Sequence, residues 1–270
     1  MKRFFPLLAL AFLVILANCQ SGKPKEAARF AVSTASPAAS VIPGTPQVII
    51  SRGFDFGSVN PKAYGVFDAK VDIDAFADAV QSAKRMKGIL DVRNPDYDAV
   101  IDNGGKRQSI HLWLDAKETF GMFMYTSDTG TGYTLTEAAT KRLRELVQSI
   151  RYGPEQAEKN GDVVFALNGI KNGNVWTDFL QQVQNRSSQT VQITAYTIEG
   201  DPIFYNLDFD GAVIRYRYDT SHDHFGTPLK QTDFCRKIEK DVSKLGTVYY
   251  LEGCGENNAK RNETFALKWR

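Results

Sequence analysis

The segment from Phe4 to Cys19 (FFPLLALAFLVILANC) constrains this chain most, because it decides in which compartment the rest must fold. Two positive residues, Lys2 and Arg3, precede the apolar run, and the run ends at a cysteine. This order is typical of a secretory signal. The run is shorter than the roughly 20 apolar residues that a membrane-spanning helix needs. The sequence therefore predicts a protein that folds outside the cytoplasm.

The end of this segment, Leu16-Ala17-Asn18-Cys19, resembles a bacterial lipobox, whose cysteine carries the lipid of the mature chain. The resemblance implies that residues 1–19 are a lipoprotein signal peptide and that Cys19 is the lipid attachment site. It also implies a palmitate-type anchor at the extracytoplasmic face of the cell membrane. Asn18 stands where glycine, alanine or serine is usual, and the alternative is ordinary signal cleavage with Cys19 as a bystander.

Composition limits the partners that the chain can have. Residues 20–47 are rich in Ser, Ala, Pro, Gly and Lys without lasting apolar periodicity, which indicates a disordered tether. The formal net charge is +2, and loss of Lys2 and Arg3 with the signal brings it to zero. The basic excess that nucleic-acid binding requires is absent. We expect contact with the membrane through the anchor, an unknown protein or glycan ligand, and no nucleic acid.

The first folded unit, residues 48–152, alternates short strands with two helices. Residues 48–50 are a β-branched run, and residues 94–115 read as a hairpin around the turn at 103–105. A third strand is expected at residues 120–125.

Helix signals in this unit are a capping residue followed by an apolar stripe. Asp72 stands at a predicted N-cap, and Gly88 is expected to close that helix region. Thr134 and Glu137 match a capping box before a second helix, which ends before Gly153-Pro154. The stripes comprise Ile73, Phe76, Val80 and Ala83 in the first helix, and Ala139, Leu143, Leu146, Val147 and Ile150 in the second.

The run PDYDAVIDNGGKRQSIHLWLD, followed by the helix YTLTEAATKRLRELV, resembles the YhfM-like domain of Gram-positive lipoproteins. The resemblance covers residues 49–150. It implies an extracytoplasmic domain with no assigned chemistry.

The second unit, residues 161–270, has a strand at 162–167 and a helix capped by Asn172 or Asn174. From Val191 the chain alternates strictly between apolar and polar residues, as a half-buried strand does. The run ITAYTIEGDPIFYNLDFDG, Ile193 to Gly211, resembles a domain of unknown function in lipoproteins of spore-forming Gram-positive bacteria. That resemblance covers residues 160–270 and brings no catalytic or ligand residue with it.

These patterns predict an α+β fold of two small domains, each with a helix packed on an antiparallel meander sheet. The boundary is expected between residues 152 and 161, because Gly153-Pro154 breaks the helix and the following residues are polar.

Asp210-Gly211 predicts a two-residue hairpin turn, because this dipeptide tolerates the positive φ that such turns need. Counting outward pairs Leu207 with Ile214 and Tyr205 with Tyr216. This row is expected to form the single buried face of the hairpin.

Cys235 and Cys254 form an even pair once Cys19 carries lipid, and export predicts a disulfide between them. Taking residues 243–246 as the loop of the last hairpin pairs Val242 with Thr247. The same count places Cys235 opposite Cys254. The alternative is two free thiols, one of them a reactive nucleophile.

The candidates for chemistry are few, and each has a plainer explanation. His222 and His224 have the spacing of metal ligands, but a solvated loop explains them better. His111 fits a sheet surface beside Leu112 and Trp113. Turn geometry accounts for two of the three carboxylates of Asp201, Asp208 and Asp210. We therefore expect no catalytic residue, no metal site and no cofactor.

The aromatic residues on neighbouring strands are expected to be mostly core, and any on the solvent face would suit a partner or glycan. They are Tyr196, Phe204, Tyr205, Tyr216 and Tyr218. The sequence favours a non-catalytic binding or interaction module at the cell envelope. The alternatives are a cell-envelope hydrolase with an unrecognised active site and an inhibitor or structural envelope protein.

Overall fold

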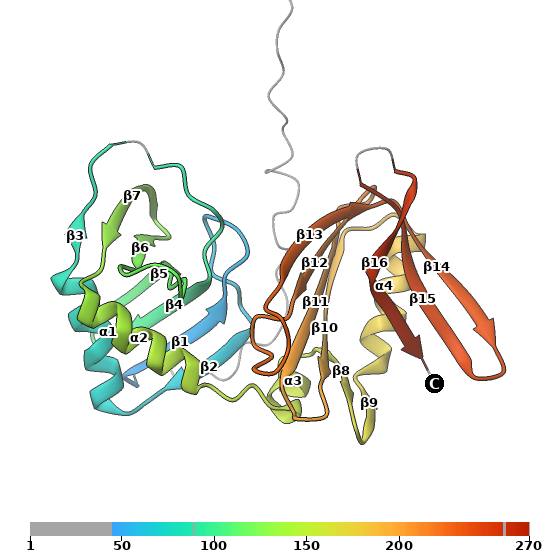
Figure 1. Cartoon of the computed structure of the whole chain (residues 1–270), viewed down its shortest axis with the longest axis horizontal. Helices are drawn as coiled ribbons and strands as arrows, with labels where there is room; N and C mark the ends of the chain where they lie inside the picture. The colour runs from blue at the N-terminus through green and yellow to red at the C-terminus, as the bar shows by residue number, and fades with distance from the viewer. Residues whose placement is uncertain (1–44, 89, 256–257, 270) are drawn as a thin grey trace, which may run out of the picture. The chain divides into compact units, whose positions relative to one another are not determined.

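The computed structural model describes residues 45–88, 90–255 and 258–269. The expected signal peptide, the lipid attachment site Cys19 and the tether up to residue 44 lie outside the described residues. The described residues belong to one compact unit and form sixteen strands and four helices, so the fold is α+β and mostly sheet (Figure 1). Among these residues, no helix has the length and apolar character needed to cross a membrane.

The N-terminal part contains a seven-stranded antiparallel sheet in the order β2-β1-β4-β5-β6-β7-β3 (Figure 1). The hairpin predicted at residues 94–115 is confirmed, and β6 lies within the predicted third strand. The strands are β1 (Gln47–Arg52), β2 (Ala63–Phe67), β3 (Lys84–Arg85), β4 (Tyr97–Asp102), β5 (Arg107–Trp113), β6 (Met122–Tyr125) and β7 (Asp128–Thr134).

Helices α1 (Lys70–Ser82) and α2 (Glu137–Ser149) share one apolar core with this sheet. The predicted N-caps are wrong. Ala69 takes the first cap position, and Thr136 rather than Thr134 caps α2, where its side chain accepts from Ala139 N at 3.1 Å. Thr134 is unavailable because it still pairs with Met122 as the last residue of β7. The first helix also ends well before Gly88, since a short strand follows it.

The C-terminal part contains a six-stranded sheet in the order β13-β12-β11-β10-β8-β9. Its β8 runs parallel to β10, because helix α4 (Gly173–Gln184) carries the chain between β9 and β10. The prediction of a purely antiparallel meander is wrong here. The strands are β8 (Val163–Ala166), β9 (Gly169–Lys171), β10 (Gln189–Tyr196), β11 (Pro202–Phe209), β12 (Ile214–Asp219) and β13 (Lys230–Cys235).

The predicted register between β11 and β12 is wrong by two residues. Leu207 pairs with Tyr216 and Tyr205 with Tyr218, so the loop spans residues 210–213. The reason is the Asp210 carboxylate, which accepts from the backbone N–H groups of residues 212 and 213 at 2.9 and 2.8 Å and closes a longer turn. A shift of two residues leaves every side chain on its predicted face.

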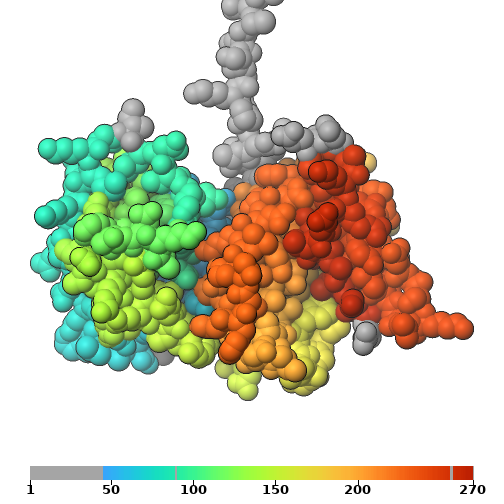
Figure 2. All heavy atoms as spheres, in the orientation of Figure 1, coloured from blue at the N-terminus to red at the C-terminus, as the bar shows by residue number. Residues whose placement is uncertain are grey.

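A three-stranded sheet completes the fold, in the order β14 (Lys237–Ser243), β15 (Gly246–Cys254) and β16 (Lys260–Trp269). The predicted pairing of Val242 with Thr247 is confirmed. The turn between β14 and β15 projects from the surface (Figure 2), and the side chain of Leu245 at its tip is 83% exposed.

Both faces of the six-stranded sheet are covered, and this corrects the prediction of one buried face. On one face, the row that contains Ile193 and Leu207 shares a core with α4 and the three-stranded sheet. On the other, Val164 and Phe204 belong to the core of the N-terminal sheet. The boundary segment is not a loose link but the helix α3 (Pro154–Lys159), whose Ala157 is fully buried.

Candidate functional site

A pocket of about 190 Å³ lies between β16 and the face of the six-stranded sheet that the three-stranded sheet covers. Three strands of the larger sheet contribute to it with one residue each, namely Phe165 of β8, Ala195 of β10 and Tyr205 of β11. The opposite wall consists of residues 265–268 of β16. Its lining includes the exposed Ala266 and Lys268, so the pocket reaches the surface and a ligand could enter without unfolding the core.

The walls of this pocket are mainly apolar, because buried apolar and exposed side chains alternate along β16. Its Phe265 and Leu267 point into the core, whereas Ala266 and Lys268 are exposed. The space exists because Ala195 is small among aromatic neighbours. Burial raises the pKa of Tyr205 to about 12, and its hydrogen bond with the Tyr218 side chain acts in the same direction, so its phenol stays protonated.

The predicted aromatic group does not form an exposed platform. Phe204 and Tyr216 are fully buried, and the other three members are half-buried. Within the group, Tyr205 lines the pocket. The alternation correctly separated the two faces but could not show that both are covered.

The opposite face of the six-stranded sheet carries a buried polar network centred on Arg52. Arg52 is 4% exposed, and its guanidinium donates to Asp219 Oδ2 at 3.0 Å and to Gln192 Oε1 at 3.1 Å and also to Asn206 Oδ1. It lies 3.8 Å from the ring centroid of Phe204. Arg52 thus ties β1 to three strands of the other sheet.

The pKa of Asp219 shows how the charges of this network act on a buried carboxyl. Burial acts to raise the pKa of its carboxyl, but the charges of Arg52 and Lys230 outweigh burial and hold the pKa well below its usual range. The carboxylate is therefore ionised at neutral pH and depends on these cations.

A second buried carboxylate, Asp162, is fully enclosed beside this network. It accepts from Lys62 Nζ at 2.7 Å, from the Tyr152 hydroxyl at 2.8 Å, and from Gln192 and Thr194 at 2.7 Å each. These partners come from both halves of the chain. The arrangement is that of a packed structural junction rather than an empty ligand site.

Two further arginines of β12 reinforce the junction. Arg215 and Arg217 both bind the carboxylates of Asp55, which precedes β2, and Asp208. The Asp208 carboxylate, a candidate for acid–base chemistry in the sequence, is thus engaged in ion pairs. Of the other two carboxylates singled out from the sequence, Asp210 closes its turn and Asp201 accepts from His224.

His111 is fully buried, which overturns its prediction as a sheet-surface residue. Its Nδ1 lies 2.7 Å from Asp98 Oδ1, and its Nε2 accepts from Gly57 N at 3.1 Å. The Phe56 ring meets it edge-on and closes that side of the sheet. His111 therefore holds the segment after β1 in place.

The two histidines of the loop after β12 have different surroundings. His222 is half-buried against aromatic rings, with its Nδ1 2.9 Å from the Tyr64 hydroxyl. Burial lowers its pKa to about 4, so the ring is neutral at physiological pH. His224 is exposed and bonds Asp201 at 3.1 Å. The solvated-loop prediction is right for His224 and wrong for His222.

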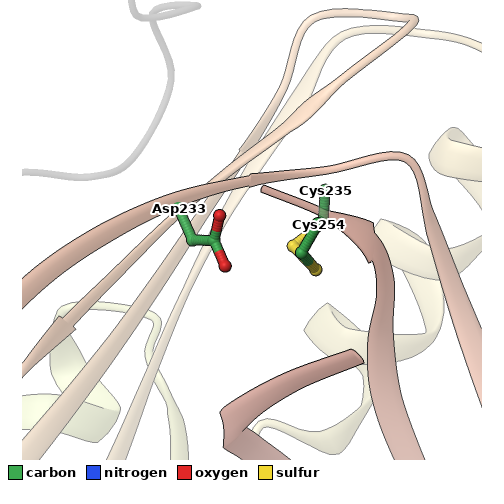
Figure 3. Close-up of side chains that lie close together, drawn as sticks. All are labelled: Asp233, Cys235 and Cys254. Atoms are coloured by element: carbon green, nitrogen blue, oxygen red, sulfur yellow. A yellow bond between two sulfur atoms is a disulfide. The ribbon is translucent and has the colours of Figure 1, made fainter. Parts of the chain in front are cut away.

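The disulfide between Cys235 and Cys254 is present, with a Cα–Cα distance of 4.1 Å (Figure 3). The bridge joins the end of β13 to the end of β15, and so links two sheets rather than the strands of one hairpin. The chain changes sheets at Arg236, which the hairpin count could not reveal. Asp233 lies beside the sulfurs (Figure 3), but both sulfurs are bonded to each other and its carboxylate accepts from Asn262 at 2.8 Å.

Sequence reasoning missed Arg52 and Asp162. A signal for Arg52 does exist, because it has the same alternation as the buried Val48 and Ile50 of β1. Asp162 directly precedes a buried strand and carries no local sign of its four partners.

Comparison with known families agrees with the two resemblances. Residues 58–152 match the family model described as YhfM protein, and residues 160–250 match the model described as Domain of unknown function (DUF4362). No curated protein and no solved structure matches the chain.

Proposed function

We propose that this protein is a non-catalytic binding module, anchored by lipid to the extracytoplasmic face of the cell membrane. In this proposal it holds an apolar group of its ligand in the pocket beside β16. The observation that carries the proposal is the pocket itself, which is open, apolar and built from the core of two sheets. Ligand sites of proteins are typically concave and apolar, with few polar groups.

The alternative of a cell-envelope hydrolase needs a side chain that is free to exchange a proton with a substrate. The buried pair of His111 and Asp98 could serve only if it were accessible, yet both ring nitrogens are engaged in the core. These contacts of His111 support binding over hydrolysis at this pair.

Filling the pocket tests the binding function directly. We expect the folded protein to bind toluene saturably, in ligand-observed NMR, and the variant Ala195→Leu to lose this binding because its side chain occupies the space. The matched control is Ala212→Leu, which makes the same change at an exposed loop position. Equal toluene binding by Ala195→Leu and the native protein would contradict the proposal.

The anchor rests on the charged start, the apolar run and the lipobox-like end of the signal. Cells that express the protein should incorporate a palmitate analogue into it, and Cys19→Ser should abolish the label because the acceptor thiol is gone. Ser21→Ala, two residues away, is the control that retains the acceptor. Label that persists in Cys19→Ser would show that this cysteine is not the anchor.

The finer organisation that we propose is two domains, residues 48–152 and 161–270, each with helices packed against its own sheet. It is supported by the family matches, which end and begin on either side of α3.

A further inference from the structure

β16 is an edge strand, and the pocket lies against it. In the described part of the chain its single strand neighbour is β15. From residue 266 to residue 269 the pairing with β15 is regular, without the irregularities seen nearer its start. The opposite edge of this segment carries backbone N–H and C=O groups that none of the other described strands pairs.

Such an edge accepts an additional strand, because backbone hydrogen bonds supply affinity and neighbouring pockets supply specificity. Residues 265–268 provide both elements, since the same residues form the strand and one wall of the pocket. A strand added to β16 would place alternate side chains toward the six-stranded sheet, and one of them at the pocket.

We propose that β16 binds an extended peptide segment of another protein by strand addition, with one apolar side chain of that segment in the pocket. This inference rests on the proposed binding function and names its ligand class. A cavity of about 150 Å³ suffices for a benzene molecule, so the volume of about 190 Å³ suits a leucine, methionine or phenylalanine side chain. The exposed Lys268 at the rim favours an acidic residue next to this anchor.

The test starts from a phage library of random heptapeptides, selected on the full-length protein in detergent and counter-selected on Ala195→Leu. We expect enriched peptides with one apolar position and no proline beside it. Their affinity for Ala195→Leu should be lower by roughly 10- to 100-fold, the effect of excluding one apolar side chain. Ala212→Leu is the matched control, and Ala195→Val replaces Ala195→Leu if the larger side chain prevents folding.

Two readouts distinguish strand addition from simple pocket binding. Hydrogen exchange of the amides of residues 264–269 should slow when a selected peptide binds. N-methylation of successive peptide residues should weaken binding at alternate positions, because only alternate N–H groups of an added strand face β16.

Several outcomes would overturn the inference. They are peptides that bind Ala195→Leu unchanged, exchange that is unaffected in β16, and N-methylation effects without alternation. Toluene binding without pocket-dependent peptides would reject strand addition and leave the proposed function standing. An oligosaccharide that occupies the pocket without protecting β16 would do the same. Absence of both toluene and peptide binding would reject both proposals.

Discussion

Replacing Arg52 with methionine is expected to lower the free energy of unfolding by about 3–5 kcal/mol, as measured by urea denaturation. The guanidinium is buried, pairs with Asp219 and bonds two amide side chains of the opposite sheet. Its removal leaves a buried carboxylate and two acceptors without this donor. Breaking such a pair costs far more than losing a surface contact.

The matched control is Arg107→Met, an exposed position on a strand of the same sheet, which should change stability by less than about 0.5 kcal/mol. The pH dependence separates charge from packing. A carboxyl with a depressed folded pKa contributes stability above its unfolded pKa and loses it as the pH falls through the folded value. Without Arg52 that contribution of Asp219 shrinks. The difference in free energy of unfolding between Arg52→Met and the native protein should therefore become smaller below about pH 4.

A loss below about 1 kcal/mol in Arg52→Met would contradict the central role of this network. The same curves test the proposed division into two domains. Because Arg52 ties the two larger sheets together, its loss should separate the unfolding into two transitions if each half folds as a unit.

The double variant Cys235→Ser/Cys254→Ser is expected to lose about 3 kcal/mol of stability, since the bridge closes a loop with a sequence separation of 19 residues. Because it joins the last strand of one sheet to the next sheet, hydrogen exchange should accelerate most in β14, β15 and β16.

Reductant provides the control for this experiment. It should destabilise the native protein by a similar amount and leave the double variant unchanged. Stoichiometric alkylation of Cys235 or Cys254 in the folded, non-reduced protein would refute the bridge.

The sequence predictions are most accurate where neighbouring residues alone decide the structure. The β4–β5 hairpin follows from its Asn-Gly-Gly turn. The β14–β15 register is also as predicted, although Ser243 pairs with Gly246 and the loop is shorter than the four residues expected. In both hairpins, the alternative conformations differ only in the backbone of a few neighbouring residues. At Asp210 the same reasoning chose a two-residue turn, because it could not weigh the hydrogen bonds of one side chain against the usual turn geometry.

The candidate pocket was partly foreseeable. Alternation placed Tyr205 on a buried face and Ala195 on the same face as Ile193, and the structure pairs Ile193 with Tyr205. The opposite wall comes from β16, some 70 residues later in the chain (Ala195 against residues 265–268). Packing between sheets whose strands lie so far apart in the chain leaves no periodic pattern in the sequence.

The sequence by itself determined the order and type of most elements, the two family resemblances and the pairing of Cys235 with Cys254. Alternation and cysteine parity are local or countable properties, and the strands and the disulfide of the structure agree with them. Only the tertiary structure decided what covers each face of the six-stranded sheet. A polar residue such as Gln192 reads as solvent-facing in a strand, yet here it is buried because Arg52 and Asp162 from other segments satisfy its hydrogen bonds. Burial of polar groups depends on partners that meet only in three dimensions.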